Sequence, residues 1–269
     1  MIKDITIGQY VPGDSFIHKL DPRTKIITAI LFIITLFIIN KFIGYIFIVA
    51  FIGAAIISSK VPPSFYFKGI KPVMTLIIIT AILNAFMIKG TESTLLFSWK
   101  FLKVYQEGLN TAAFMTLRLL FLIVGTSILT LTTSPIELTD ALERLLKPLS
   151  VIGISSHEVA MMMTIALRFI PTLIDETDKI MKAQKARGAD FDGGNIFEKA
   201  KSLIPLLVPL FISSFKRADE LAMAMEARCY RGGSGRTRMK QLKYSSKDAF
   251  AYSVIALMLI ISFYIKIAL

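Results

Sequence analysis

Two segments of the sequence end in the same pattern of alanine and arginine, A-x-x-A-R. The first reads AQKARG and contains Arg187, and the second reads AMEARC and contains Arg228. An arginine at the end of a helix can simply complement the negative end of the helix dipole, an effect of about 0.3 to 1 kcal/mol. As a desolvated anchor in an interface it can contribute about 2 kcal/mol or more. Because the pattern occurs twice, beside alanines that allow close approach, we favour paired contacts with a two-part partner.

The other chemically versatile residues are few and scattered. The single cysteine, Cys229, has no second cysteine for an internal disulfide, and the two histidines, His18 and His157, cannot form a usual zinc site alone. Asp190 and Asp192 are candidates for metal-assisted chemistry, but no second acidic cluster matches them. The sequence also lacks the G-x-x-x-x-G-K-[ST] motif of a phosphate-binding loop. We therefore expect no catalytic site, metal or cofactor in this chain.

The composition is typical of an integral membrane protein. Of the 269 residues, 54% are hydrophobic and the mean hydropathy is +0.64, yet the formal net charge is +12. Apolar residues concentrated in membrane spans, with Lys and Arg on the cytoplasmic side, explain both values. A nucleic-acid binder would need a recognisable module or a basic face with aromatic platforms, so no nucleic-acid partner is expected. The N-terminal segment has acidic residues and no early apolar core, and we expect it not to be a cleaved signal peptide.

Five apolar segments are predicted to span the bilayer. The run from Ile26 to Ser58 would form a helix of about 50 Å, too long for a hydrocarbon core of about 30 Å, and Asn40 marks the natural break. The expected spans are residues 26–40, 42–58, 72–88, 111–133 and 249–269. Residues 89–110 are then an external or partly re-entrant loop.

Arg118 lies inside the fourth predicted span. Its insertion costs about 2.5 to 3.5 kcal/mol, whereas the surrounding Leu, Ile, Phe and Val residues favour insertion by roughly 3 to 7 kcal/mol. The span therefore remains possible, and Arg118 either extends toward the interface or forms a functional ion pair.

The basic loops determine the expected orientation. Lys60 to Lys71 contains three lysines and no acid, and Arg228 to Lys247 contains seven basic residues and no acid. Both stretches belong in the cytoplasm by the positive-inside rule. Hence the N-terminus is expected inside and the C-terminus outside.

Residues 134–248 are predicted to form three amphipathic helices rather than spans. The first covers Ser134 to Leu149, and the other two end near the A-R pairs. Pro171, Pro205 and Pro209 are expected to bend the second and third helices. Charged residues, including Glu176 in the second helix and Arg217 in the third, are expected on faces away from the apolar stripes.

The two arginine segments also predict where the long helices end. Gly188 fits a left-handed cap directly after Arg187, whereas Cys229 follows Arg228. Methionines supply flexible apolar surface suited to a moving partner, although ordinary core packing explains some of them equally well.

Several motifs resemble the transmembrane T component of energy-coupling-factor transporters, which are ABC-type importers. They are DSFIHKLDPRTK, TLTTSPIELTDALERLLKPL, HEVAMMMTIALRFIPTL, AQKARGADF, VPLFISSFKRADELAMAMEAR and GGSGRT. The resemblance implies an all-α, polytopic membrane protein with about five transmembrane helices and a cytoplasmic coupling module. The expected parts are residues 1–133 with the first four spans, the module at 134–248 and the last span at 249–269.

The resemblance also implies partners and contact residues. The partners are two ABC-type ATPases, which bind ATP and Mg²⁺, a small membrane-embedded S component that binds the substrate, and the bilayer of a prokaryotic cell. The implied ATPase contacts are Ala186, Arg187, Gly188, Ala227, Arg228 and Cys229, the last departing from the family's usual glycine. The implied S-component contacts are Met161, Met162, Met163, Leu206, Leu207, Phe211 and Phe215.

Two other classes of function stay open at this point. A secondary transporter usually has ionisable groups near the membrane midplane and repeated halves, but the predicted spans contain no Asp or Glu. A membrane-bound enzyme would depend on acids such as Asp190 and Asp192. The substrate, whether a vitamin or a metal ion, cannot be read from the sequence.

Overall fold

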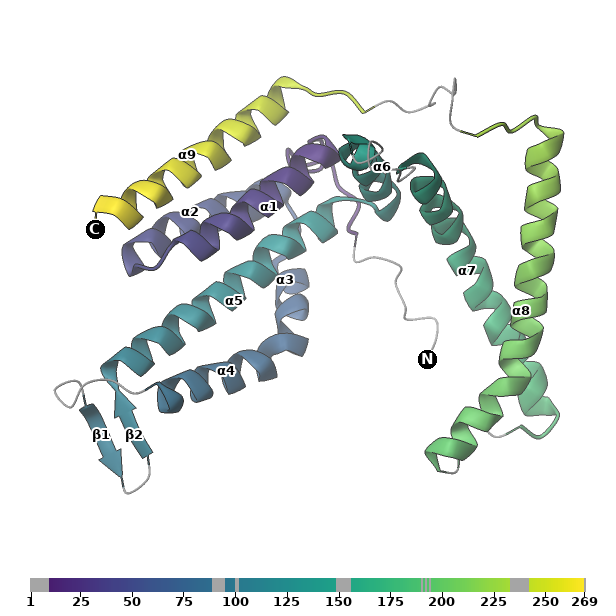
Figure 1. Cartoon of the computed structure of the whole chain (residues 1–269), viewed down its shortest axis with the longest axis horizontal. Helices are drawn as coiled ribbons and strands as arrows, with labels where there is room; N and C mark the ends of the chain where they lie inside the picture. The colour runs from purple at the N-terminus through teal and green to yellow at the C-terminus, as the bar shows by residue number, and fades with distance from the viewer. Residues whose placement is uncertain are drawn as a thin grey trace. The chain divides into compact units, whose positions relative to one another are not determined.

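The computed structural model describes residues 10–88, 95–99, 102–148, 156–189, 191, 193, 195–232 and 242–268 (Figure 1). The chain divides into two compact units at residues 141/142 and 241/242. One comprises Gly8–Ala141 with Leu242–Leu269, and we call it the bundle unit. The other lies within Leu142–Gln241, and we call it the arm unit. The expected borders at 133 and 249 differ from these divisions and stay predictions.

Helices dominate both units, as expected for an all-α polytopic membrane protein. The bundle unit contains α1 (Pro22–Ile38), α2 (Phe42–Ser59), α3 (Pro63–Ile70), the short 3-10 helix η2 (Lys71–Val73), α4 (Met74–Met87), α5 (Gln106–Thr132) and α9 (Ser246–Ala268). Helix α6 (Pro135–Leu146) contains the division, and the arm unit contains α7 (Ser156–Ala186) and α8 (Ile196–Ala227). Within the bundle unit, α1, α2, α3 and α4 all pack against α5, and α9 packs against α1 (Figure 1).

The start of α1 is tied to the start of α9 by buried polar contacts. Asp21 caps α1, accepting a bond from the backbone N–H of Arg23 at 2.9 Å, and its own N–H donates to Oδ1 of Asp248 at 2.8 Å. The other oxygen of Asp248 accepts bonds from the N–H and hydroxyl of Ser245. These contacts join residues far apart in sequence, so the last helix is docked on the first.

The apolar core of the bundle unit lies where α1, α2 and α5 meet. It includes Leu36, Ile48 and Leu131, each with no exposed surface. Many apolar residues on the outer faces of the same helices are exposed, which is the pattern expected of helices whose outer surface faces lipid.

Five helical segments are long and apolar enough to cross a membrane, and four of them overlap spans that the sequence predicts. They are Phe42–Ser59, Pro63–Met87, Gln106–Thr132, His157–Ala186 and Ser246–Ile267. Helix α1 falls outside the set because it has only 17 residues. Helix α7 is in the set by its length and hydropathy, whereas the sequence predicted an amphipathic helix rather than a span there; its continuation through Pro171 agrees with the predicted long helix. These assignments rest on length and composition, so the placement of α7 at the membrane stays a prediction.

Two segments that were predicted as loops are regular structure instead. Leu95–Trp99 (β1) and Leu102–Tyr105 (β2) form an antiparallel hairpin within the segment 89–110, and α5 begins at Gln106 rather than near residue 111. Most of Lys60 to Lys71 is helix α3, which has Pro63 in its first turn. Aromatic and β-branched residues, including Phe97, Trp99, Val104 and Tyr105, explain the hairpin. Residues 89–94 and 100–101 lie outside the described residues.

Arg118 holds the turn between α1 and α2. Its Nη2 atom donates to the carbonyl of Ile39 and to Oδ1 of Asn40, both at 3.2 Å, and its guanidinium lies over the Phe37 ring. No carboxylate within the described ranges forms an ion pair with it. In the structure Arg118 therefore contacts a carbonyl, an amide and an aromatic ring, and not a carboxylate as in the ion pair that the sequence left open.

Candidate functional site

Helices α7 and α8 form an antiparallel pair in the arm unit. Nε2 of Gln184, near the end of α7, donates to the carbonyl of Pro205, early in α8, at 3.4 Å. The hydroxyl of Tyr230, just after α8, donates to Sδ of Met161, near the start of α7, at 3.0 Å. Helix α7 therefore ends beside the first half of α8, and α8 ends beside the start of α7.

This arrangement places the two arginine motifs at opposite ends of the pair. Arg228 lies two residues before Tyr230, which contacts Met161. Arg187 lies about 26 residues after Met161, and a rise of ~1.5 Å per residue gives a separation on the order of 40 Å. The sequence contains the repeated motif, but it does not indicate how far apart Arg187 and Arg228 lie, because that distance depends on the antiparallel packing of α7 and α8.

Helix α7 ends in a left-handed cap directly after Arg187. The N–H of Gly188 donates to the carbonyl of Lys185, and the N–H of Ala189 donates to the carbonyl of Gln184, both at 3.0 Å. Gly188 has a φ of +88°, the left-handed conformation that glycine adopts without steric cost. The predicted role of Gly188 as the cap residue is observed in the structure.

Helix α8 ends in the same pattern of hydrogen bonds. The N–H of Cys229 donates to the carbonyl of Glu226 at 2.8 Å, and the N–H of Tyr230 donates to the carbonyl of Met225 at 3.0 Å. Cys229 has a φ of +54°, so a residue with a Cβ occupies the left-handed position. The departure from glycine at Cys229 therefore leaves the cap geometry intact, and each arginine is the residue directly before a left-handed turn.

Both arginines are exposed. The four neighbouring motif residues, Ala186, Gly188, Ala227 and Cys229, are exposed as well. Within the described ranges, no hydrogen bond or ion pair of the Arg187 or Arg228 side chain is found. Each cap therefore presents an exposed cation beside small side chains, so that the planar guanidinium group is accessible to a carboxylate.

A polar contact holds the two helices together at their crossing. Oε2 of Glu176 on α7 accepts a bond from Nη2 of Arg217 on α8 at 2.8 Å, and Oε1 of Glu176 accepts a bond from the hydroxyl of Ser213. We call Glu176, Ser213 and Arg217 the polar latch. The sequence interpretation placed Glu176 and Arg217 on faces away from the apolar stripes. In the structure these faces meet, a contact that sequence periodicity alone cannot indicate.

An apolar cavity of about 330 Å³ lies beside the polar latch. Residues of α7 such as Phe169 and Leu173 line one side, and residues of α8 such as Leu221 and Met225 line the other. The two helices are therefore not fully packed against one another along this stretch.

The residues expected to contact an S component are mostly exposed. Met162, Met163, Leu207 and Phe211 are exposed, and Phe215 retains 69% of its accessible surface. Two of these expected contact residues are less exposed than the others. Met161 is half-buried and bonded to Tyr230, and Leu206 is only 6% exposed, so it offers almost no surface to a partner in this conformation.

The exposed apolar stripe on α8 is longer than the sequence interpretation indicated. Leu203, Ile204, Val208 and Ile212 are all exposed and alternate with Leu207, Phe211 and Phe215 at helical spacing. The signal in the sequence was the run LIPLLVPLFI itself, in which one face repeats every three to four residues.

The described residues contain no group of three His, Cys, Asp or Glu side chains that could bind a metal ion. Nδ1 of His157 lies 3.2 Å from Oε1 of Glu143, and Nδ1 of His18 lies 2.7 Å from the hydroxyl of Ser15. Asp190 and Asp192, the candidates for metal chemistry, lie outside the described residues.

Comparison with known proteins agrees with the fold. Residues 13–240 match the protein family described as CbiQ, cobalt transport protein. A protein of Clostridium kluyveri is 69% identical over 260 residues, covering 97% of this chain and 96% of its own. Proteins of Ruminiclostridium cellulolyticum and Bacillus subtilis are 57% and 49% identical, and each alignment covers at least 92% of both chains. All three carry the name energy-coupling factor transporter transmembrane protein EcfT.

The helical fold and the matched family together define a polytopic, predominantly helical transmembrane component of a transporter. The chain belongs to the CbiQ family, in which its relatives are the EcfT transmembrane proteins of energy-coupling factor transporters. Membership confirms the resemblance inferred from the sequence motifs and the multi-pass membrane character of the chain.

Proposed function

We propose that this chain is the non-catalytic scaffold and coupling subunit of an ATP-driven importer for vitamins or metal ions. The observation that carries the proposal is the pair of matching arginine caps at opposite ends of one antiparallel helix pair. A dimer of ABC-type ATPases offers two related docking surfaces, and two separated anchors of the same geometry suit such a partner. ATP and Mg²⁺ are bound by those ATPases and not by this chain.

The exposed apolar stripe on α8 is the proposed contact for a small, membrane-embedded S component that holds the substrate. It is supported by the large apolar side chains that α8 leaves exposed, including Phe211, Ile212 and Phe215. Closure of the ATPases on ATP would move the two caps, and the helix pair would transmit that movement to the S component. Coupling requires an element whose conformation depends on the nucleotide bound by one partner and whose contacts with a second partner change with that conformation. The helix pair would be this element.

The orientation of the chain is also part of the proposal. Lys60 follows α2, Lys68 lies in α3 and Lys71 begins η2, and we place this end of the bundle unit in the cytoplasm. The N-terminus and the arm unit are then cytoplasmic, and α9 ends on the external side.

Reversing both charges tests the docking role. We expect Arg187→Glu with Arg228→Glu to abolish association with the ATPases and ATP-driven uptake while the chain still inserts into the membrane. The matched control reverses two exposed lysines of the same helices, Lys182→Glu with Lys216→Glu, and should retain uptake. Pull-down of the complex and uptake of labelled substrate are the measurements. Full uptake by the arginine variant would refute the proposal.

A further inference from the structure

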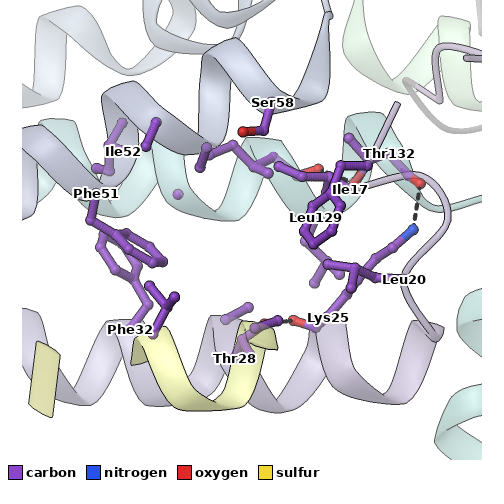
Figure 2. A pocket seen from close by; sticks show the side chains of 18 of the residues that line it. Ile17, Leu20, Lys25, Thr28, Phe32, Phe51, Ile52, Ser58, Leu129 and Thr132 are labelled. Carbon is purple, nitrogen blue, oxygen red and sulfur yellow. Dashed lines mark hydrogen bonds between the residues drawn. The ribbon is translucent and has the colours of Figure 1, made fainter. Parts of the chain in front are cut away.

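The bundle unit contains an apolar cavity of about 200 Å³ between α1, α2, α5 and α9 (Figure 2). On α1 its lining residues run from Lys25 to Phe32, and on α5 they run from Gly125 to Thr132, in both cases at positions i, i+3, i+4 and i+7. This spacing follows one face of a helix over two turns. The cavity is therefore a slot parallel to the helix axes, roughly 10 Å long at ~1.5 Å per residue. We call it the lateral slot.

Side-chain contacts mark both ends of the lateral slot. At one end the rings of Phe32 and Phe51 are stacked with centroids 5.7 Å apart. Gly125 admits the Phe32 ring there, since a Cβ at Gly125 would lie 2.3 Å from Cε1 of Phe32. At the other end Nζ of Lys25 donates to the carbonyl of Thr132 at 2.9 Å, the contact that Figure 2 draws as a dashed line.

The lateral slot opens sideways. Among its lining residues, Ala54 and Ser58 of α2 and Phe250 of α9 are exposed, whereas Ile52 on the inner wall is buried. The helices that form the opening, α2 and α9, are both long and apolar enough to span a membrane. In a bilayer such an opening faces lipid, and an apolar recess there is filled by a hydrocarbon chain rather than by water.

The charge at the polar end indicates what kind of lipid fits. Lys25 is 5% exposed, and its ammonium donates to the carbonyls of His18 and Thr132. Within the described ranges no carboxylate forms an ion pair with Lys25, although Glu137, Asp248 and Asp21 act on its charge from a longer distance. Lys60, which follows α2, adds an exposed cation at the same end of that helix. In the proposed orientation this end lies in the cytoplasmic leaflet, which is rich in anionic lipids.

We propose that the lateral slot binds an acyl chain of an anionic phospholipid from the cytoplasmic leaflet. The chain lies along the helix axes from the Lys25 end to the Phe32–Phe51 pair, and the phosphate lies outside the opening, within the field of Lys25 and Lys60. A lipid bound in this way fills the space between α2 and α9 and fastens the last helix to the bundle.

Photolabelling tests the site in the complete transporter in nanodiscs. The probes are phosphatidylglycerol and phosphatidylcholine, each with a diazirine near the middle of one acyl chain. We expect the phosphatidylglycerol probe to label the slot-lining stretches of α1, α2 and α5, and to do so more strongly than the phosphatidylcholine probe. Equal labelling by the two probes, or labelling spread evenly over all outer helix faces, would contradict the proposal.

A filling variant with a matched control identifies the slot itself. Ala55→Phe puts an aromatic ring into the slot, whereas Ala50→Phe makes the same change on an exposed position of the same helix. We expect Ala55→Phe to lower the labelling about tenfold, the ratio for 1.4 kcal/mol of binding, and Ala50→Phe to leave it unchanged. Ala29→Phe fills the slot from α1 and should repeat the loss if Ala55→Phe prevents folding.

Two results would overturn the proposal. One is unchanged labelling in folded Ala55→Phe and Ala29→Phe variants. The other is slot labelling that disappears in the assembled transporter but is present in the isolated chain, which would assign the slot to a side chain of a partner protein.

Discussion

The ends of α7 and α8 share one backbone geometry but differ in the residue that makes the turn. In both, an exposed arginine precedes a residue of positive φ, and the same two backbone hydrogen bonds close the helix. The turn residue is Gly188 in one and Cys229 in the other, with φ of +88° and +54°. The position of the arginine relative to the turn is therefore the shared feature, and glycine is the easier but not the necessary means of reaching it.

The comparison also separates two properties that the sequence motif combines. The cap orients the arginine, and this depends on local hydrogen bonds. The distance between the two arginines depends on how α7 crosses α8, which involves the polar latch and the contacts Gln184 to Pro205 and Tyr230 to Met161.

Single charge reversals should have the largest effect and show whether the two caps contribute equally. Arg187→Glu and Arg228→Glu each remove a proposed interface anchor; an anchor of about 2 kcal/mol corresponds to roughly thirtyfold weaker ATPase binding. Surface plasmon resonance with immobilised ATPases measures the change. Lys182→Glu and Lys216→Glu are the single controls. Wild-type affinity for both arginine variants would mean that neither cap is an anchor.

Replacing Gly188 should loosen the α7 cap next most strongly. Nothing lies within 4 Å of the position that a Cβ would take, so the cost of Gly188→Ala is the left-handed conformation itself, about 1 to 2 kcal/mol. We expect faster amide hydrogen exchange at Ala189, whose N–H bonds Gln184, and unchanged exchange at the end of α8. Equal amide exchange at Ala189 in the wild-type chain and the Gly188→Ala variant would show that an alanine adopts the left-handed conformation at residue 188 at little cost in free energy.

Neutralising the polar latch should weaken the crossing by a smaller amount. Glu176→Gln removes the charge that pairs with Arg217. Because both side chains are partly exposed, we expect the free energy of unfolding to fall by about 1 kcal/mol. The expected result is a lower melting temperature of the purified chain and fewer substrate molecules imported per ATP hydrolysed. Asp175→Asn, at an exposed neighbouring position, is the control. Unchanged melting and unchanged coupling would show that apolar packing alone sets the crossing.

Giving the α8 cap the glycine that α7 has should produce the smallest effect. Cys229→Gly relieves the left-handed strain at φ +54° and should stabilise the end of α8 by about 1 kcal/mol or less. Slower amide exchange at Tyr230 is the measurement, with Cys229→Ala as a control that keeps the Cβ. Faster exchange in the glycine variant would mean that the Cys229 side chain stabilises the cap through contacts of its own.

The sequence allowed most of the long helices and the ends of the two motif helices to be predicted, but not α3 or the start of α5. The break at Asn40, the long helices ending at Ala186 and Ala227, and the cap at Gly188 all follow from local apolar runs and capping residues. The hairpin β1–β2 was missed because short strands with bulges give a weak pattern beside strong helical runs. Leu206 was assigned to an exposed face because sequence spacing does not show which neighbour covers a given residue.

Local interactions within a few residues thus determined the type of protein, its helices and the repeated arginine caps, because periodicity and capping act over one or two turns. Contacts between distant segments decided how far apart the two caps lie. The antiparallel pairing of α7 with α8, the polar latch, the anchoring of Arg118 on the α1–α2 turn and the lateral slot join residues far apart in the chain. Such contacts depend on side chains meeting in space, which no spacing along the sequence specifies.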